Sequence, residues 1–365
     1  MALAARRDFL RAGAGCALAG LAARGASQDP AARLVPKRNG ALNVQPLRRF
    51  EAAAGAEPLI EPELVALQMR AVYELGFERI RITVPFGRFG PDFLGAVPYV
   101  RCARALGIDV LAVMADFTGF DLAQALVRDA TRAEVVAAYL AILDGPGEVA
   151  APAVKRRGEL ALQVLNEPTH FLGLTPRDYA FELLAPVRDA IRVRSDSVRV
   201  AAAAALGNVD GLARLRELFQ LGYDRYCDVV AYHVYSRRLI PALAGLARGA
   251  VWVTESGVDG TARHRDWYTR TFQEIRETLP EVERLYWFDL FDRAPGRFRL
   301  IDIVRDGPGF AAVPESAGLI AHLEERVAEA AAGRPLLAFA DLVPDVTDYF
   351  PTPADLDVIA ATSFA

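Results

Sequence analysis

Short apolar runs alternate with longer amphipathic stretches along most of the chain, from about residue 41 to about residue 331. Apolar runs of this kind are typical of strands buried on both faces, and the longer stretches have the period of helices. The pattern predicts strands at residues 41–45, 79–84, 109–114, 160–165, 198–205, 229–234, 251–254 and 285–290. Helical patterns lie between the strands, such as those at residues 61–75, 97–106, 132–143, 176–192, 212–221 and 267–278, and a final helix at 315–331 would close the ring.

Glycines mark the ends of three predicted helices. Leu75-Gly76, Leu106-Gly107 and Leu221-Gly222 each place a glycine where a helix commonly ends in a left-handed residue. Eight strand–helix units in sequence predict an α/β fold, a closed parallel (β/α)8 TIM barrel, rather than an open sheet. The run 198–205 is ambiguous because its alanines fit a helix equally well, but its place between the fourth and sixth strands favours a strand.

Composition and charge restrict the class of protein. The chain has 365 residues, enough for one barrel of typical size without a second domain. Apolar residues make up 53% and charged residues 24%, a balance that argues against disorder. The formal net charge of −4 offers no basic field for nucleic acid or an anionic membrane, so we expect neither as a partner.

The first residues have a pattern of their own. Arg6-Arg7 is followed by Asp8-Phe9-Leu10, a weakly apolar stretch at 12–23 and small residues, which resembles a twin-arginine (Tat) export signal. A frayed alanine-rich helix is the alternative. The apolar stretch is too short to span a bilayer, so we expect no membrane span in the mature protein.

The expected organisation has three segments. They are a signal at 1–26, a catalytic barrel at 27–332 and a C-terminal extension packed on the barrel at 333–365. We expect an exported monomer in the periplasm or outside the cell.

The cysteines and histidines lack the spacing of metal ligands. Cys16 lies in the expected signal, which leaves Cys102 and Cys227 as small buried hydrophobic side chains. A disulfide between them is permitted in an oxidising compartment, but the sequence does not establish their proximity. We expect neither a metal nor another cofactor.

Two glutamates lie at the ends of apolar runs. Glu167 lies in Asn166-Glu167-Pro168 just after the run 160–165, and Glu255 follows 251–254. A carboxylate at the end of a hydrophobic strand is costly to bury and is rarely retained for stability alone. Because the active site of a TIM barrel lies at the carboxyl ends of its strands, two such acids predict a pair that acts on a sugar bond.

Further polar and aromatic residues occupy equivalent positions on other predicted strands. They are Arg81 on the second strand, Asp116 after the third, Asn166 and His170 after the fourth, Asn208 after the fifth, His233 and Tyr235 at the sixth, and Trp287 on the eighth. Because the carboxyl ends of all barrel strands meet on one face, we expect these side chains to converge there.

This ordered set resembles the retaining glycoside hydrolases of clan A, whose (β/α)8 barrels carry catalytic glutamates at the ends of strands four and seven. The resemblance covers roughly residues 40–330, and both the cellulase-like family 5 and the xylosidase-like family 39 fit it. It implies that Glu167 is the acid/base, that Glu255 is the nucleophile, and that an oligo- or polysaccharide is the substrate.

The same resemblance gives other residues roles around Glu255. Arg81 and Tyr235 would hydrogen-bond its carboxylate and keep it ionised. Asn166 would bind the sugar 2-hydroxyl, a contact that strengthens in the transition state. Trp287 would offer an apolar face to the sugar.

Four residues have less definite roles. His233 matches the histidine of the clan's His-x-Tyr motif on strand six, and it could equally be a satisfied interior histidine. Asp116 departs from the pattern, because many family 5 members carry histidine there, and it is a candidate substrate contact. His170 and Asn208 are further candidate contacts.

Structural alternatives exist for the other assignments. Arg81 could belong to a barrel ion pair, Trp287 could be core, and the two glutamates could form structural salt bridges. For the whole protein, the second hypothesis is a catalytically inactive carbohydrate-binding protein on a glycosidase-like barrel. A lyase or aldolase barrel is a third, but the chain shows no strand-end lysine and no phosphate-binding glycine loop.

Overall fold

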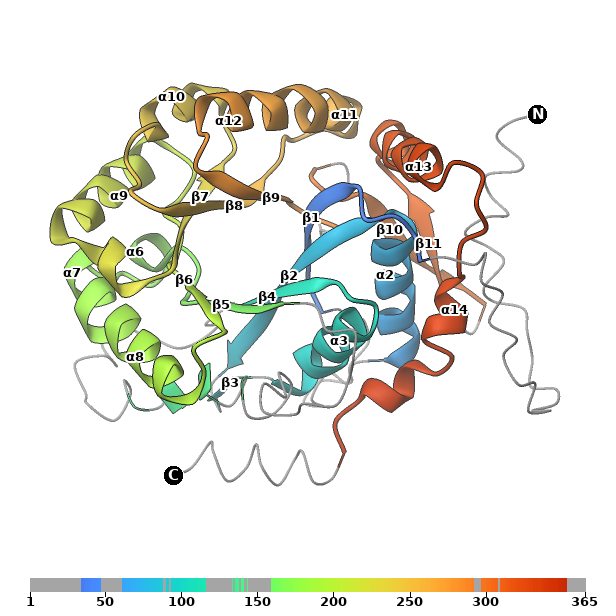
Figure 1. The fold of residues 1–365 in the computed structure, drawn as a ribbon, viewed down its shortest axis with the longest axis horizontal. Coiled ribbons are helices and arrows are strands. Elements are labelled where there is room, and N and C mark those ends of the chain that lie inside the picture. The colour runs from blue at the N-terminus through green and yellow to red at the C-terminus, as the bar shows by residue number, and fades with distance from the viewer. Residues whose placement is uncertain are drawn as a thin grey trace.

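Parallel strands close into a barrel at the centre of the molecule (Figure 1). The computed structural model describes residues 34–46, 61–87, 90–91, 93–115, 133, 135–137, 139–140, 143, 159–291, 297–307 and 309–352. The barrel strands are β1 (Asn39–Val44), β2 (Phe77–Gly87), β4 (Asp109–Ala115), β5 (Leu160–Gln163), β6 (Arg199–Ala201), β7 (Val229–Val234), β8 (Ala250–Ser256) and β9 (Val282–Trp287). β1 pairs with both β2 and β9, which closes the ring. The predicted TIM barrel is confirmed, with a strand at each predicted position.

The fifth barrel strand is shorter than the run that predicted it. β6 covers only Arg199–Ala201, and residues 202–205 continue as buried chain without regular structure. Tyr179 accounts for this end, because its hydroxyl accepts a hydrogen bond from the backbone N–H of Ala203 at 2.5 Å. The ambiguous alanines are therefore neither helix nor continued strand.

Helices cover the outer side of the barrel (Figure 1). They are α2 (Pro62–Glu74), α3 (Phe93–Ala105), α7 (Pro176–Asp178), α8 (Ala185–Arg194), α9 (Val209–Leu221), α10 (Ile240–Leu243), α11 (His264–Asp266), α12 (Phe272–Thr278) and α13 (Ala317–Ala331). π-helical turns at Tyr179–Leu184 and Trp267–Thr271 join α7 to α8 and α11 to α12 into continuous helical runs. Within the predicted helix 132–143, the residues that the structure describes are helical.

Two apolar layers hold the barrel together. A large cluster fills the space between strands and helices, and a small cluster fills the barrel interior. Trp252 is fully buried in the interior cluster, with the guanidinium groups of Arg284 and Arg199 over its ring at 4.0 Å and 4.8 Å. These cation–π contacts lie near the amino-terminal ends of the strands, so they close the barrel at that end.

Two strand pairings lie outside the predicted pattern. β10 (Ile301–Asp306) and β11 (Gly309–Pro314) form an antiparallel hairpin between β9 and α13. β3 (Gly90–Pro91) pairs with the end of β2 in the same antiparallel sense. Because β10 and β11 form a separate two-stranded sheet, the strand–helix period that predicted the barrel does not reveal them.

After α13 the chain returns to the first helices. The ring of Phe339, in α14 (Phe339–Leu342), lies 6.4 Å from that of Tyr73 on α2. Arg101 on α3 donates a hydrogen bond to the carbonyl of Phe350 at 3.2 Å. This part of the C-terminal extension therefore packs on α2 and α3.

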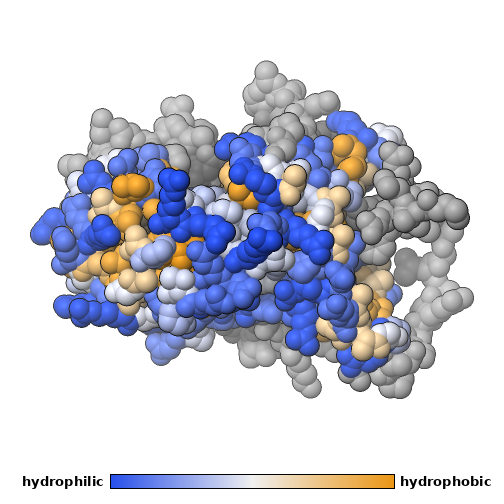
Figure 2. All heavy atoms as spheres, turned by 90° about the horizontal axis from the view of Figure 1, so that it is seen from above, coloured by the Kyte–Doolittle hydropathy of each residue, from blue (hydrophilic) through white to orange (hydrophobic). Residues whose placement is uncertain are grey.

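The described residues on the face seen in Figure 2 are mostly hydrophilic, with small apolar patches among them. Large apolar side chains that are exposed in the described part are single valines on separate elements: Val193, Val209, Val304 and Val313. Among the helices of that part, none is both long and apolar enough for a bilayer crossing.

The glycines that end the helices have the predicted left-handed conformation, with φ of +66° at Gly76 and Gly107 and +72° at Gly222. At Gly76 a Cβ would lie 2.5 Å from Cγ2 of Val327 and 2.6 Å from the carbonyl oxygen of Pro36. Gly333 also has a positive φ, of +74°, but its Cβ position is open.

Replacing Gly76 with alanine should therefore add a steric clash to the left-handed strain. We expect Gly76→Ala to lower the free energy of unfolding by about 1–3 kcal/mol more than Gly333→Ala, which carries the strain alone. Urea denaturation of the two variants measures the difference. Equal losses would show that the contact of Gly76 with α13 is unimportant.

Candidate active site

Glu167 and Glu255 occupy the carboxyl ends of β5 and β8. Glu255 lies within β8 and is paired in register with His233 on β7. Glu167 precedes the short helix α6 (Pro168–Phe171) and has a φ of +45°, while Leu165 has a φ of +65°. Left-handed conformations cost about 1–3 kcal/mol for residues other than glycine and are concentrated at functional sites.

The two carboxylates face one another in a buried setting. Glu167 is 4% exposed and Glu255 is 6% exposed. A carboxylate oxygen of each and a ring nitrogen of His233 all lie within 4.8 Å of one another. Such a group could also ligate a metal ion, but the Arg81 guanidinium beside Glu255 would repel a cation there.

Arg81 on β2 is the centre of a buried hydrogen-bond network. Its Nη1 donates to Oε1 of Glu255 at 2.9 Å and to Oδ1 of Asn43 at 2.7 Å. Its Nε donates to Oε1 of Gln163 at 2.9 Å, and its Nη2 donates to Oδ1 of Asn166 at 2.7 Å. The Arg81 side chain is 3% exposed, so its charge and its N–H donors need partners within the protein. Glu255 compensates the charge, and side-chain oxygens accept the hydrogen bonds.

Glu255 is held as a carboxylate by its neighbours. Its Oε2 accepts a hydrogen bond from the hydroxyl of Tyr235 at 2.7 Å, so both hydrogen bonds predicted for it, from Arg81 and Tyr235, are present. Burial alone would raise the pKa of Glu255, but the neighbouring His233, the charge of Arg81 and these two hydrogen bonds outweigh it and lower the pKa. Ionised Glu255 therefore stabilises the fold at neutral pH, and this stabilisation is lost as the pH falls through its folded pKa.

His233 lies between the two acids. Its Nδ1 is 2.5 Å from Oε1 of Glu167, and its Nε2 is 3.5 Å from Oε1 of Glu255. The imidazole is fully buried, and Nε2 has no hydrogen-bond partner within the described residues. The ring therefore lies between the two carboxyl groups and contacts both.

Three other residues that we expected to contact the substrate are not placed in this network. His170 is exposed on α6. Asn208 caps α9, because its side-chain oxygen accepts a hydrogen bond from the backbone N–H of Gly211 at 2.8 Å. Asp116 lies outside the described residues.

Trp287 does not offer a face to a ligand, and the expectation that it would is wrong. The residue is fully buried, and its ring packs against His264, Tyr268 and Phe272 from the α11–α12 run. Successive side chains of a strand point to opposite sides. Tyr286 points into the barrel interior, so Trp287 points outward into the helix layer.

Aromatic side chains beside Glu255 come instead from Phe288 and Phe298. Their rings lie 6.2 Å and 5.5 Å from that of Tyr235 and 5.7 Å from each other, and both residues are partly exposed. Phe288 directly follows Trp287, so a shift of one residue along the strand would have found it. Phe298 lies in the loop before β10, and no strand pattern marks it.

Asn43 and Gln163 were also missed by the sequence reasoning. Both are buried, and both lie inside apolar runs that predicted strands. A polar residue inside such a run is the signal that could have found them, because a buried amide needs hydrogen-bond partners.

The barrel is similar in fold to solved structures, although no protein-family model and no curated protein matches the chain. A family 39 glycoside hydrolase from the gut symbiont Bacteroides cellulosilyticus WH2 is similar, with a TM-score of 0.52 and 15% identity. The similarity covers 79% of this chain and 62% of that one, so the chain spans less than two thirds of its length. At this identity, the likeness is one of fold.

Two further structures have lower scores. The catalytic domain of a family 30 xylanase C from Talaromyces cellulolyticus has a TM-score of 0.49 at 13% identity, over 80% of this chain and 77% of that one. A family 39 β-xylosidase from Caulobacter crescentus has a TM-score of 0.47 at 17% identity, over 80% and 72%.

Replacing Arg81 with methionine should leave Glu255 as an uncompensated buried charge. We expect Arg81→Met to lower the free energy of unfolding by about 3–5 kcal/mol at neutral pH, measured by urea denaturation. Without the cation the pKa of Glu255 rises, so the deficit should shrink as the pH is lowered toward about 4, where glutamate binds a proton.

The double variant Arg81→Met/Glu255→Gln is the control, because it buries no carboxylate at this position. It should recover much of the loss. Equal losses in the single and double variants would contradict a dominant role for the ion pair.

Proposed function

We propose that the protein is a retaining glycoside hydrolase that cleaves an O-glycosidic bond of an oligo- or polysaccharide. The observation that carries the proposal is the buried carboxyl pair with oxygens within 4.8 Å, one member of which is held ionised. Retaining enzymes need a nucleophile and an acid/base about 5–5.5 Å apart, whereas inverting enzymes leave a wider gap for water. The fold is compatible with this chemistry, but by itself it argues no function.

In the first step Glu255 attacks the anomeric carbon. The bond between that carbon and the leaving oxygen breaks, and a covalent glycosyl-enzyme forms on the Glu255 carboxylate. Glu167 gives its proton to the leaving oxygen, so the aglycone departs as a neutral alcohol.

In the second step water takes the place of the aglycone. Glu167, now a carboxylate, accepts a proton from the water while the water oxygen attacks the anomeric carbon. The bond to Glu255 breaks, and two inversions give a sugar with retained configuration. These steps consume one water per bond and need no cofactor or metal.

His233 contacts both carboxyl groups in an arrangement that suits the first step. With Glu167 protonated, its O–H donates to Nδ1 of His233 across the 2.5 Å contact. The tautomer is then fixed with its hydrogen on Nε2, which faces Oε1 of Glu255 at 3.5 Å. In this arrangement the N–H of His233 points toward the negative charge of the nucleophile.

Substrate contacts follow from the groups that the network leaves available. Arg81 occupies the side-chain oxygen of Asn166, so the amide nitrogen is the group left to donate to the oxygen of a sugar 2-hydroxyl. Phe288 and Phe298 provide an apolar surface for the C–H face of a sugar. They take the role that the sequence assigned to Trp287.

Replacing Glu255 with alanine should abolish turnover of an aryl glycoside with a good leaving group. Added azide can occupy the space and attack the anomeric carbon, so we expect restored turnover and a glycosyl azide of inverted configuration, identified by NMR. Unchanged activity of Glu255→Ala would refute the nucleophile assignment.

Glu167→Ala is the matched variant at the other carboxyl group. It should still form the glycosyl-enzyme from activated substrates, which need no proton, but it should hydrolyse it slowly, giving a burst of released aryl alcohol. If the wild-type protein binds glycans and turns none over, the carbohydrate-binding hypothesis replaces this one.

We also propose that the chain is exported as a monomer to the periplasm or beyond, on the strength of Arg6-Arg7 and the apolar stretch after them. Changing both arginines to lysine should hold the protein in the cytoplasm of a bacterium with the twin-arginine pathway. Cell fractionation with immunodetection measures this, and undiminished export would refute the signal assignment.

A further inference from the structure

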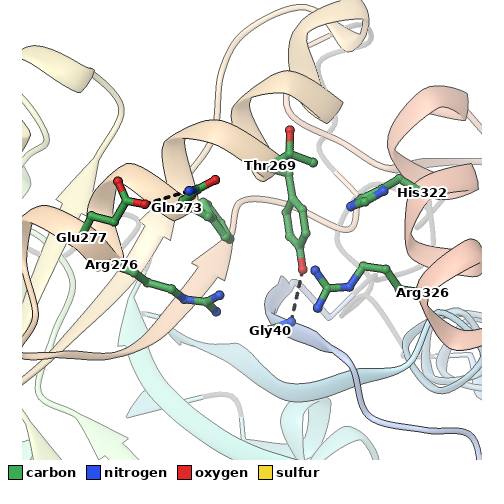
Figure 3. Close-up of a pocket in the computed structure, with 9 residues that line it drawn as sticks. Gly40, Thr269, Gln273, Arg276, Glu277, His322 and Arg326 are labelled. Atoms are coloured by element: carbon green, nitrogen blue, oxygen red, sulfur yellow. Dashed lines mark hydrogen bonds between the residues drawn. The ribbon is translucent and has the colours of Figure 1, made fainter. Parts of the chain in front are cut away.

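A pocket opens on the side of the barrel, between the α11–α12 run and α13 (Figure 3). Its volume is about 530 Å³, within the range of small-molecule sites. Gly40 at the start of β1 lies at its floor, whereas the glutamate pair lies at the carboxyl ends of the strands. The lining residues are Gly40, Tyr268, Thr269, Phe272, Gln273, Arg276, Glu277, His322 and Arg326.

Two guanidinium groups enter this pocket from opposite walls. Figure 3 shows Arg276 on α12 and Arg326 on α13 both extending toward Gly40. Arg276 lines the pocket with no ion pair to another described residue, and Arg326 has one hydrogen bond there, to the carbonyl of Arg38. Burial raises the pKa of Tyr268; the hydrogen bond from Gly40 and the charges of Arg326 and Arg276 oppose that rise, and the charge of Glu78 adds to it.

Tyr268 adds a fixed donor to the two cations. Its hydroxyl oxygen accepts a hydrogen bond from the backbone N–H of Gly40 at 3.2 Å. The hydroxyl proton is then left to donate, and it has no acceptor among the residues described. Tyr268 is only 5% exposed, so the donor is already in place before any ligand arrives.

Acidic groups do not cancel this arrangement. Glu277 is the one carboxylate in the lining, and it accepts a hydrogen bond from the side-chain amide of Gln273 at 2.7 Å. Burial lowers the pKa of His322 on the opposite wall. The charges of Arg265 and Arg326 lower this pKa further, and those of Glu325 and Glu329 partly oppose the shift. The lining therefore presents cationic and hydroxyl donors toward its centre with few available acceptors.

We propose that this pocket binds a small organic oxyanion, of about monosaccharide size, with its phosphate or carboxylate group between Arg276 and Arg326. Arginine pairs recognise such groups through charge-assisted hydrogen bonds, and the Tyr268 hydroxyl supplies a further one. This binding is independent of the proposed glycosidase activity, because no residue of the pocket belongs to the glutamate network.

Isothermal titration calorimetry of the full chain tests the proposal with three probes: inorganic phosphate, glucose 6-phosphate and glucuronate. At constant ionic strength set with sodium chloride, we expect saturable binding of at least one organic probe. Arg276→Gln and Arg326→Gln should each weaken it by about tenfold, the value of one charge-assisted hydrogen bond. The stronger of the two organic probes identifies the anionic group.

Arg270→Gln is the matched control, because Arg270 is exposed on the same helical run but paired with Asp266 at 2.7 Å. It should bind the probe as the wild type does. Tyr268→Phe keeps the ring that packs the core and should weaken binding with little loss of stability. No saturable binding, or equal weakening by Arg270→Gln, would overturn the proposal.

Discussion

The Arg81 guanidinium joins four barrel strands into one buried network, because it contacts Asn43 on β1, Gln163 at the end of β5 and Glu255 on β8 from its own position on β2. A carboxylate buried without such a partner would take up a proton or destabilise the fold. The cation therefore allows Glu255 to be both buried and charged. It also aligns Asn166, so that the residue before Glu167 is fixed by the same group.

Burial and charge act in opposite directions at this site, and their balance produces two different carboxyl groups. Glu255 has a guanidinium and a phenol as donors, whereas Glu167 contacts His233. Two like acids in close proximity are more useful when their environments separate their roles. The network separates the two roles with side chains from several strands. The backbone hydrogen bonds between the barrel strands hold each of these side chains in place.

The two ends of the barrel differ in what their charges do. Near the amino-terminal ends of the strands, Arg199 and Arg284 stack on Trp252, and Arg284 pairs with Glu159, which is a structural arrangement. At the carboxyl ends Arg81 and Glu255 form an ion pair, and Tyr235 links it to the partly exposed rings of Phe288 and Phe298. The interhelical pocket is a third setting, in which arginines extend from helices and not from strands.

The sequence by itself determined the barrel, its strand order and the end that carries the acids. Apolar runs and glycine caps are local signals, and strand pairing in a parallel barrel follows chain order. The proximity of Glu167, Glu255, Arg81 and Tyr235 could therefore be predicted from the sequence. Only the tertiary structure decided which way individual side chains point. Trp287 and Phe288 are adjacent, and a strand points neighbouring side chains to opposite faces. An error of one residue in register therefore assigns a core side chain to the active site. Phe298, the Asn43–Gln163 amides and the pocket between α12 and α13 depend on segments distant in sequence, for which no local pattern encodes proximity.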